Sequence, residues 1–116
     1  MLVEQFNTNC PHCMHQAPIM NQLYAKVEAD AQLKNKLKFI AAGQGNEVGQ
    51  LKMWKAFNKV PFPLVPDPNQ AWGKAVNFTP YPVTMLVNKA GKIVFVHIGA
   101  FDNADEVFQK IKAVAK

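Results

Sequence analysis

Residues 9–18 read NCPHCMHQAP and contain both cysteines of the 116-residue chain, Cys10 and Cys13. Pro11 suits the first turn of a helix, where its missing N–H costs no hydrogen bond. Pro18 should kink the same helix further along. Beyond the cysteines, apolar side chains recur at the spacing of a helix, namely Ala17, Met20, Leu23, Tyr24 and Val27. The stretch therefore predicts a helix that begins at the two cysteines.

Strand and helix signals alternate along the whole chain, which predicts an α/β domain built on a central sheet. A strand at residues 2–7 precedes the cysteines. The last helix has the clearest signal, because Asn103 and Glu106 are placed like a capping box ahead of an apolar stripe from Ala104 to Ala115. The other predicted elements are a strand at 37–42, a helix with Val48, Leu51, Trp54 and Phe57 on one face, a short edge strand at 63–65, a short helix at 69–76 with Trp72 and Val76 inward, and a hairpin of 83–88 and 92–98 that turns at Lys89-Ala90-Gly91.

Composition predicts one compact domain over residues 1–116. The net charge of +5 comes from lysines spread along the chain without any arginine, which is typical of solvated faces and argues against a nucleic-acid partner. Apolar runs are far shorter than the roughly 20 residues of a membrane span. We expect a monomer without a membrane span, in a periplasmic or other extracytoplasmic compartment after removal of its signal, with a cytoplasmic location as the alternative.

The spacing of the two cysteines indicates chemistry rather than a structural cross-link. A bridge across two residues closes too small a loop to stabilise a fold. Cys10 lies beyond the helix N-terminus, which favours the thiolate, and Cys13 one turn later can attack a mixed disulfide and release a substrate. His12 between them would stabilise the Cys10 thiolate and make the disulfide more oxidising; the alternative is a neutral surface histidine.

The motif also resembles a known superfamily. Cys10-Pro11-His12-Cys13 followed by Ala17-Pro18-Ile19 resembles the active-site helix of thioredoxin-like proteins, and its Pro-His pair resembles that of DsbA-type oxidases. Tyr81-Pro82-Val83-Thr84 resembles the cis-proline loop of the superfamily, and residues 89–92 with Gly99 resemble its terminal hairpin. Residues 62–68 resemble the insert shared by TlpA/ResA-like proteins and peroxiredoxins. The resemblance implies a thioredoxin-like fold with a mixed sheet of about four strands flanked by helices.

Further site residues follow from the resemblance. It implies that Pro82 is cis and lies against the disulfide, with the backbone of Tyr81 offered to a substrate strand. Glu4, six residues before Cys10, matches a buried acid that helps to move the proton of the resolving cysteine; an exposed strand carboxylate is the alternative. Asn9 stands where an aromatic residue usually precedes the first cysteine, and we expect no counterpart here of the N-terminal strand that often comes before this segment in the superfamily.

The implied function is thiol-disulfide exchange with protein substrates and with a redox partner protein. Cys10 would be the nucleophile and Cys13 the resolving cysteine, with no cofactor other than their own disulfide. The Pro-His pair argues for an oxidant, whereas the TlpA/ResA-like body is associated with reductants.

Two alternatives use the same cysteines. The first is a zinc or copper module in which Cys10 and Cys13 are joined by His15 or His97, although one Cys-x-x-Cys supplies only half of a structural zinc site. The second is a peroxiredoxin-like peroxidase. That chemistry wants a threonine or serine three residues before its cysteine, where this chain has Asn7, and a proline further upstream, which the chain lacks.

Overall fold

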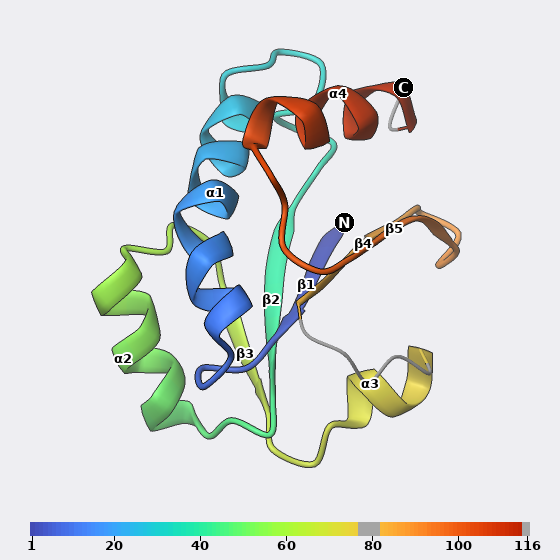
Figure 1. Ribbon diagram of the computed structural model, residues 1–116. Coiled ribbons are helices and arrows are strands. Elements are labelled where there is room, and N and C mark those ends of the chain that lie inside the picture. The colour runs from blue at the N-terminus through green and yellow to red at the C-terminus, as the bar shows by residue number, and fades with distance from the viewer. Residues whose placement is uncertain (77–81, 115–116) are drawn as a thin grey trace.

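The computed structural model describes residues 1–76 and 82–114, which form one sheet flanked by helices (Figure 1). The central strand β1 leads directly into the cysteine motif, so the site starts from the middle of the sheet. The elements are β1 (Leu2–Phe6), α1 (Pro11–Glu28), β2 (Phe39–Gln44), α2 (Val48–Asn58), β3 (Leu64–Asp67), α3 (Ala71–Val76), β4 (Val83–Val87), β5 (Ile93–Ile98) and α4 (Ala104–Val114).

The sheet has five strands in the order β3-β2-β1-β4-β5, one more than the four expected. β1, β2 and β3 run parallel, and β4 and β5 join by antiparallel pairing. The short edge strand expected at 63–65 is present as β3, which brings the count to five, and its Pro66 pairs with Gly43 of β2. A proline cannot donate a backbone hydrogen bond, but an edge strand needs donors on one side only. A proline-rich segment can therefore close this sheet, although it predicts a strand only weakly.

The helices are divided unequally between the two faces of the sheet. α1, α2 and α4 cover one face, and α3 lies on the other (Figure 1). Leu2 and Phe6 of β1 pack with Cys13 and Met20 of α1 in the main apolar cluster. Because side chains alternate along a strand, Glu4 points to the same face as Leu2 and Phe6. A carboxyl group is thus built into the face that carries the cysteines.

α2 differs from its predicted packing. Only Leu51 of its predicted apolar face is buried, Trp54 is half-buried with its ring 5.3 Å from that of Phe6, and Phe57 is 87% exposed. The helix lies over the edge formed by β2 and β3, where the sheet is too narrow to cover a full apolar stripe. Spacing alone predicted the helix correctly and its buried face incorrectly.

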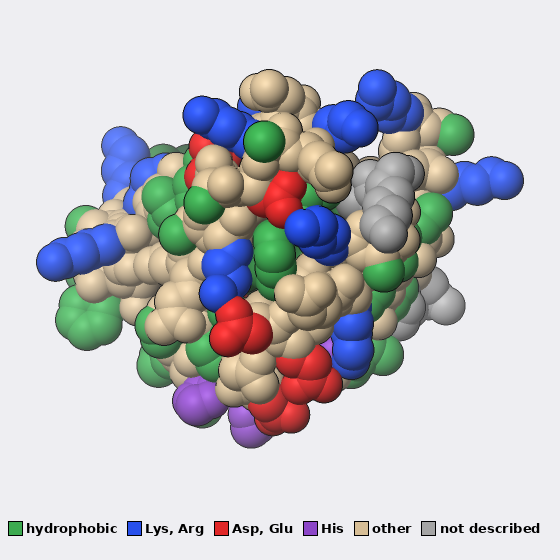
Figure 2. Space-filling view, turned by 90° about the horizontal axis from the view of Figure 1, so that it is seen from above, with side chains coloured by type: hydrophobic (Ala, Val, Ile, Leu, Met, Phe, Trp, Pro, Cys, Tyr) green, Lys and Arg blue, Asp and Glu red, His purple; other side chains and the backbone are tan. Residues whose placement is uncertain are grey.

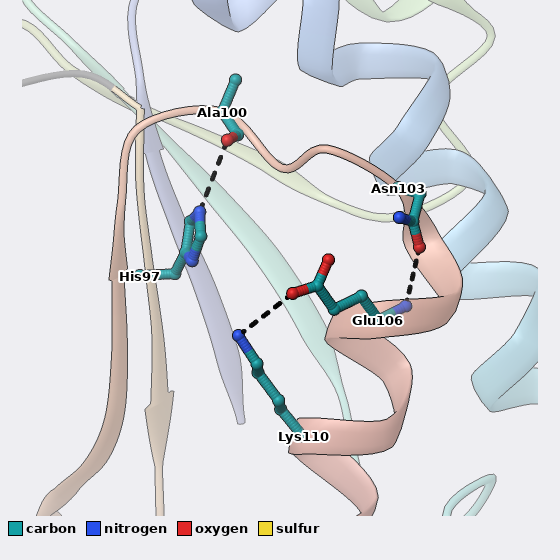
Figure 3. Close-up of polar contacts among 5 residues, drawn as sticks. All are labelled: His97, Ala100, Asn103, Glu106 and Lys110. Atoms are coloured by element: carbon teal, nitrogen blue, oxygen red, sulfur yellow. Dashed lines mark hydrogen bonds and ion pairs between the residues drawn. The ribbon is translucent and has the colours of Figure 1, made fainter.

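The C-terminal part agrees closely with the sequence. β4 and β5 form the predicted hairpin, and Gly91 supplies the positive φ of 82° in its turn. The side chain of Asn103 accepts a hydrogen bond from the backbone N–H of Glu106 at 2.8 Å, as a helix cap does (Figure 3). In a full capping box the Glu106 side chain would also accept a hydrogen bond from the backbone N–H of Asn103. Here its carboxylate lies instead 3.6 Å from the Lys110 ammonium group.

α1 runs through Pro18 as a single helix, with the proline ring on its exposed side. α4 packs beside it and adds an ion pair between Lys26 and Asp105. Figure 2 shows lysine side chains scattered around this end of the molecule and interrupted by acidic ones. Within residues 1–76 and 82–114, the longest helices are too polar or too short to cross a bilayer.

Candidate active site

The two cysteines occupy opposite environments at the start of α1. Cys10 is the N-cap residue, with extended backbone angles (φ −87°, ψ 116°), and its sulfur accepts a hydrogen bond from the backbone N–H of Cys13 at 3.3 Å. Cys10 is half-exposed, whereas Cys13 is only 1% exposed. The free N–H groups of a helix N-terminus favour negative charge at the first sulfur. Partner molecules can reach Cys10 and cannot reach Cys13.

Several neighbours keep Cys13 protonated. Burial is the main cause that raises the pKa of its thiol, and a hydrogen bond to Cys10 raises it further. A backbone hydrogen bond from Asn7 acts in the opposite direction, while the charges of Cys10 and Glu4 add to the increase. The pKa of Cys13 therefore lies well above its ordinary value. A nearby base is needed before this sulfur can act as a nucleophile.

Glu4 is buried beside this thiol, which decides between its two predicted environments. Burial raises the pKa of Glu4 from 4.5 to about 7, although a hydrogen bond from Gln16 lowers it. That hydrogen bond runs from Nε2 of Gln16 to Oε2 of Glu4 and measures 2.6 Å. A carboxyl group with a pKa near neutrality can both accept and release a proton under ordinary conditions.

Gln16 was missed by reasoning from sequence. It lies one turn after Cys13 on the inner face of α1, and its Oε1 accepts a hydrogen bond of 3.1 Å from the backbone N–H of Phe101. One signal for it exists in the sequence. Helical spacing places a polar Gln16 on the apolar face that holds Cys13, Ala17 and Met20, and a buried polar side chain needs partners.

The loop between β1 and α1 is fixed by the β2–α2 loop, a contact that the sequence did not predict. Thr8 and Asn46 exchange two hydrogen bonds, from Thr8 N to Asn46 Oδ1 (3.1 Å) and from Asn46 Nδ2 to Thr8 Oγ1 (3.0 Å). Asn7 donates to the backbone carbonyl of Gln44 at 2.6 Å, and its own side-chain oxygen accepts from Asn9 N. These four hydrogen bonds position the segment that precedes Cys10.

The other predicted site residues are spread around the motif. Pro11 is the first residue of α1, and His12 is exposed on the same turn. Pro82 is buried immediately before β4, and its carbonyl accepts a hydrogen bond of 2.8 Å from Gly99 N. Tyr81 lies outside the described residues, so the cis peptide bond expected before Pro82 stays a prediction.

The two histidines of the metal hypothesis belong to different elements. His15 is exposed on α1. His97 is on β5, where its Nε2 is 3.4 Å from the Ala100 carbonyl oxygen (Figure 3). The centroid of its ring is 4.8 Å from that of Phe101. Within residues 1–76 and 82–114, no three His, Cys, Asp or Glu side chains come close enough to hold a metal ion. Among the described residues, the groups gathered at the motif are the two thiols and the Glu4 carboxyl group.

An apolar groove of about 470 Å³ opens next to Cys10. Asn9 and Met14 form its wall on the motif side, and Met53, Trp54 and Phe57 form its wall on α2. Met14, Met53 and Phe57 are all largely exposed. An apolar surface therefore lies close to the half-exposed Cys10, on the side of α2, and begins at its neighbour Asn9.

The family model named Redoxin matches residues 1–112. The chain belongs to the Redoxin family. A curated relative, the thiol-disulfide oxidoreductase ResA of Halalkalibacterium halodurans, is 27% identical over 112 residues, which are 95% of this Redoxin chain and 61% of that relative. The chain thus spans less than two thirds of the relative's length.

Solved structures share the fold. A Chlorobium tepidum protein, described as a candidate DsbE thiol:disulfide interchange protein, matches with a TM-score of 0.82 at 21% identity over 99% of this chain and 79% of that one. StoA of Bacillus subtilis matches with a TM-score of 0.76 at 22% identity, over 93% of this chain and 78% of that one. A secreted disulfide oxidoreductase of Mycobacterium tuberculosis matches with a TM-score of 0.77 at 18% identity, over 97% of this chain and 79% of that one. The predicted thioredoxin-like fold is confirmed, with five strands.

Proposed function

We propose that this Redoxin-family chain is a thiol-disulfide oxidoreductase that exchanges disulfides with protein substrates. The observation that carries the proposal is the contrast between the two sulfurs on one helical turn. Cys10 is accessible at the helix N-terminus, and Cys13 is buried one turn further on. Such a pair suits an attacking thiolate and a resolving thiol.

In the proposed reaction, the Cys10 thiolate attacks one sulfur of a substrate disulfide, and the other substrate sulfur leaves as a thiolate. Cys13 then gives its proton to the Glu4 carboxylate and attacks the sulfur of Cys10. The bond between Cys10 and the substrate breaks, and the second substrate sulfur leaves. Two electrons pass to the substrate, and the Cys10–Cys13 disulfide remains. The reverse sequence oxidises a substrate dithiol, so the reduction potential sets the direction.

Protein substrates are favoured over small molecules by the surface around Cys10. A mixed disulfide places the substrate chain over the residues next to this sulfur, and the groove that begins at Asn9 and Met14 offers apolar contact there. From the resemblance, Tyr81 and Pro82 would bind the substrate backbone. We further propose a monomer that works outside the cytoplasm with a separate redox partner protein. The location is supported by the Mycobacterium tuberculosis protein of the same fold, which is described as secreted.

Trapping with single variants tests these roles. We expect Cys10→Ser to abolish exchange with a disulfide-bonded protein such as insulin. Cys13→Ser should still attack but accumulate a mixed disulfide, because the resolving sulfur is lost. Nonreducing gels and intact mass measure the adducts. Equal trapping by both variants would contradict the assigned roles, and absence of exchange by the unaltered chain would contradict the proposed function.

A further inference from the structure

The side chain of Gln16 bridges two elements that meet beneath the cysteines. It is 0% exposed, and both ends of its amide are used. Nε2 donates to Glu4 on β1, and Oε1 accepts from the backbone of Phe101 in the segment between β5 and α4. The residue lies three positions after Cys13 on α1. A buried amide thus connects the carboxyl group beside the resolving thiol to a backbone 85 residues away.

The Phe101 contact determines which way the Gln16 amide faces. A backbone N–H can only donate, so the atom of Gln16 that meets Phe101 must be the oxygen. The NH₂ group is then left to face Glu4, and the flipped amide would place two donors against each other at Phe101. Gln16 therefore presents a donor to Glu4 in every protonation state. The acidic proton of Glu4, when present, is kept on the oxygen that does not face Gln16.

We propose that Gln16 is the positioning residue of this site, which fixes the Glu4 carboxyl group and leaves one of its oxygens to take the proton of Cys13. The inference rests on the proposed exchange reaction and adds a residue to it. During resolution, one proton passes from the Cys13 sulfur to the free Glu4 oxygen, and the electron pair of Cys13 forms the bond to Cys10. Gln16 exchanges no proton and remains a donor throughout.

The hydrogen bond also affects the charge state of Glu4. A donor stabilises the carboxylate more than the neutral acid, so it counteracts the effect of burial on the pKa of Glu4. Among residues 1–76 and 82–114, the titratable groups around Glu4 are Cys13 on α1, with Cys10 beyond it, and His97, which lies in the same row across β1, β4 and β5. The His97 ring is engaged with Ala100 and Phe101. Gln16, which carries no charge at any pH, donates a hydrogen bond to Glu4 next to these titratable groups.

Gln16→Met tests the proposal, because methionine is similar in length and has no amide. Carbon-13 NMR of the Glu4 carboxyl group should show its titration midpoint moving upward by about one pH unit, the effect of losing one hydrogen bond to a charged group. The rate of mixed-disulfide resolution should reach its plateau at correspondingly higher pH. At a pH below both midpoints this lowers the rate about tenfold, since each unit is a factor of ten in the ionised fraction of Glu4.

Gln44→Met is the matched control. Gln44 is also a buried glutamine that donates to a carboxylate, but its partner is Asp67, at the edge strand. We expect a comparable loss of stability and no change in the Glu4 midpoint or in the pH profile of resolution. If both variants move the profile equally, or if Gln16→Met moves neither observable, Gln16 only holds elements together and the proposal is wrong.

Two further variants keep the proposal testable if Gln16→Met folds poorly. Gln16→Glu sets two carboxyl groups against each other, so they should share a proton and raise the midpoint further. In a Glu4→Gln background, Gln16→Met should leave the pH profile unchanged; a shift there would contradict the proposal. The NMR titration needs no turnover. An upward shift without disulfide exchange would refute the proposed function while leaving the Gln16–Glu4 contact established, and an unchanged midpoint with normal exchange would refute the role of Gln16 alone.

Discussion

Two carboxyl groups in this small domain accept a hydrogen bond from a buried glutamine, but they lie in different surroundings. Glu4 lies on the central strand under α1 and accepts from Gln16. Asp67 ends the edge strand β3 and accepts from Gln44 at 2.6 Å, and also from the backbone N–H groups of Ala71 and Trp72, both at 2.8 Å. The first carboxyl group lies in an apolar core, and the second caps a helix.

The surroundings shift the two pKa values in opposite directions. Burial dominates at Glu4 and raises its pKa to about 7. At Asp67 burial also acts upward, but the N–H groups of Trp72 and Ala71 and the amide of Gln44 outweigh it, so its pKa is lowered. A donor from glutamine is common to both and does not decide the outcome. The number of donors and the exclusion of water separate a group poised for proton transfer from one that serves structure.

Glu4→Gln should produce the largest effect. The folded protein keeps a proton on Glu4 that the unfolded chain releases above pH 4.5, so this stabilisation is complete below pH 4.5 and is lost as the pH rises to about 7. At about 1.4 kcal/mol per unit, the unaltered chain should lose roughly 3 kcal/mol across this window relative to the variant. Urea unfolding at several pH values measures the difference. Parallel stability curves would show that Glu4 ionises normally.

Asp67→Ala should have a smaller effect of a different kind. Loss of the cap should lower the free energy of unfolding by about 1 kcal/mol at pH 7. Because the folded pKa of Asp67 is lowered, its contribution is present at neutral pH and is lost as the pH falls below 3.8 and through the folded value. Asp67→Asn retains an acceptor and serves as the control. The resolution rate of a mixed disulfide should match that of the unaltered chain; a slower rate would tie Asp67 to the chemistry and end the contrast with Glu4.

His12→Pro should change the redox balance rather than the folding stability, and it sharpens the contrast between buried and exposed charges. His12 is exposed on the first turn of α1, where water screens its interaction with Cys10. We expect the reduction potential to become more negative by a few tens of millivolts, and 30 mV corresponds to about 1.4 kcal/mol for this couple. Equilibration with glutathione measures the shift. An unchanged potential would mean that the dipeptide between the cysteines does not control the redox balance.

Sequence reasoning worked best where the signal is local. The hairpin turn at Gly91 and the cap at Asn103 involve neighbouring residues, and both were predicted. The buried face of α2 was not, because how much of a helix is covered depends on where the sheet ends. The edge strand at 63–65 was predicted, but its extension to Asp67 and the total of five strands were not, since the pairing of Pro66 with Gly43 is a contact between distant segments.

The same division holds for the candidate site. Cys10 and Cys13 follow from their spacing at the start of a predicted helix, and Glu4 follows from the resemblance to thioredoxin-like proteins. Gln16 and Asn46 were missed, since their partners Phe101 and Thr8 are brought to them by the fold. A sequence shows which side chains can react more readily than it shows which ones orient them.

The two edges of the sheet differ in how they would meet another molecule. β3 carries Pro66 and follows Pro63, and prolines obstruct the addition of a strand. β5 reads IVFVHI without a proline or a formal charge, and it exposes Val94, Val96 and Ile98 on one face. Such a segment has the composition of strands that pair between chains. At high concentration, self-association through backbone pairing should therefore begin at β5, on the opposite edge of the sheet from the proline-guarded β3.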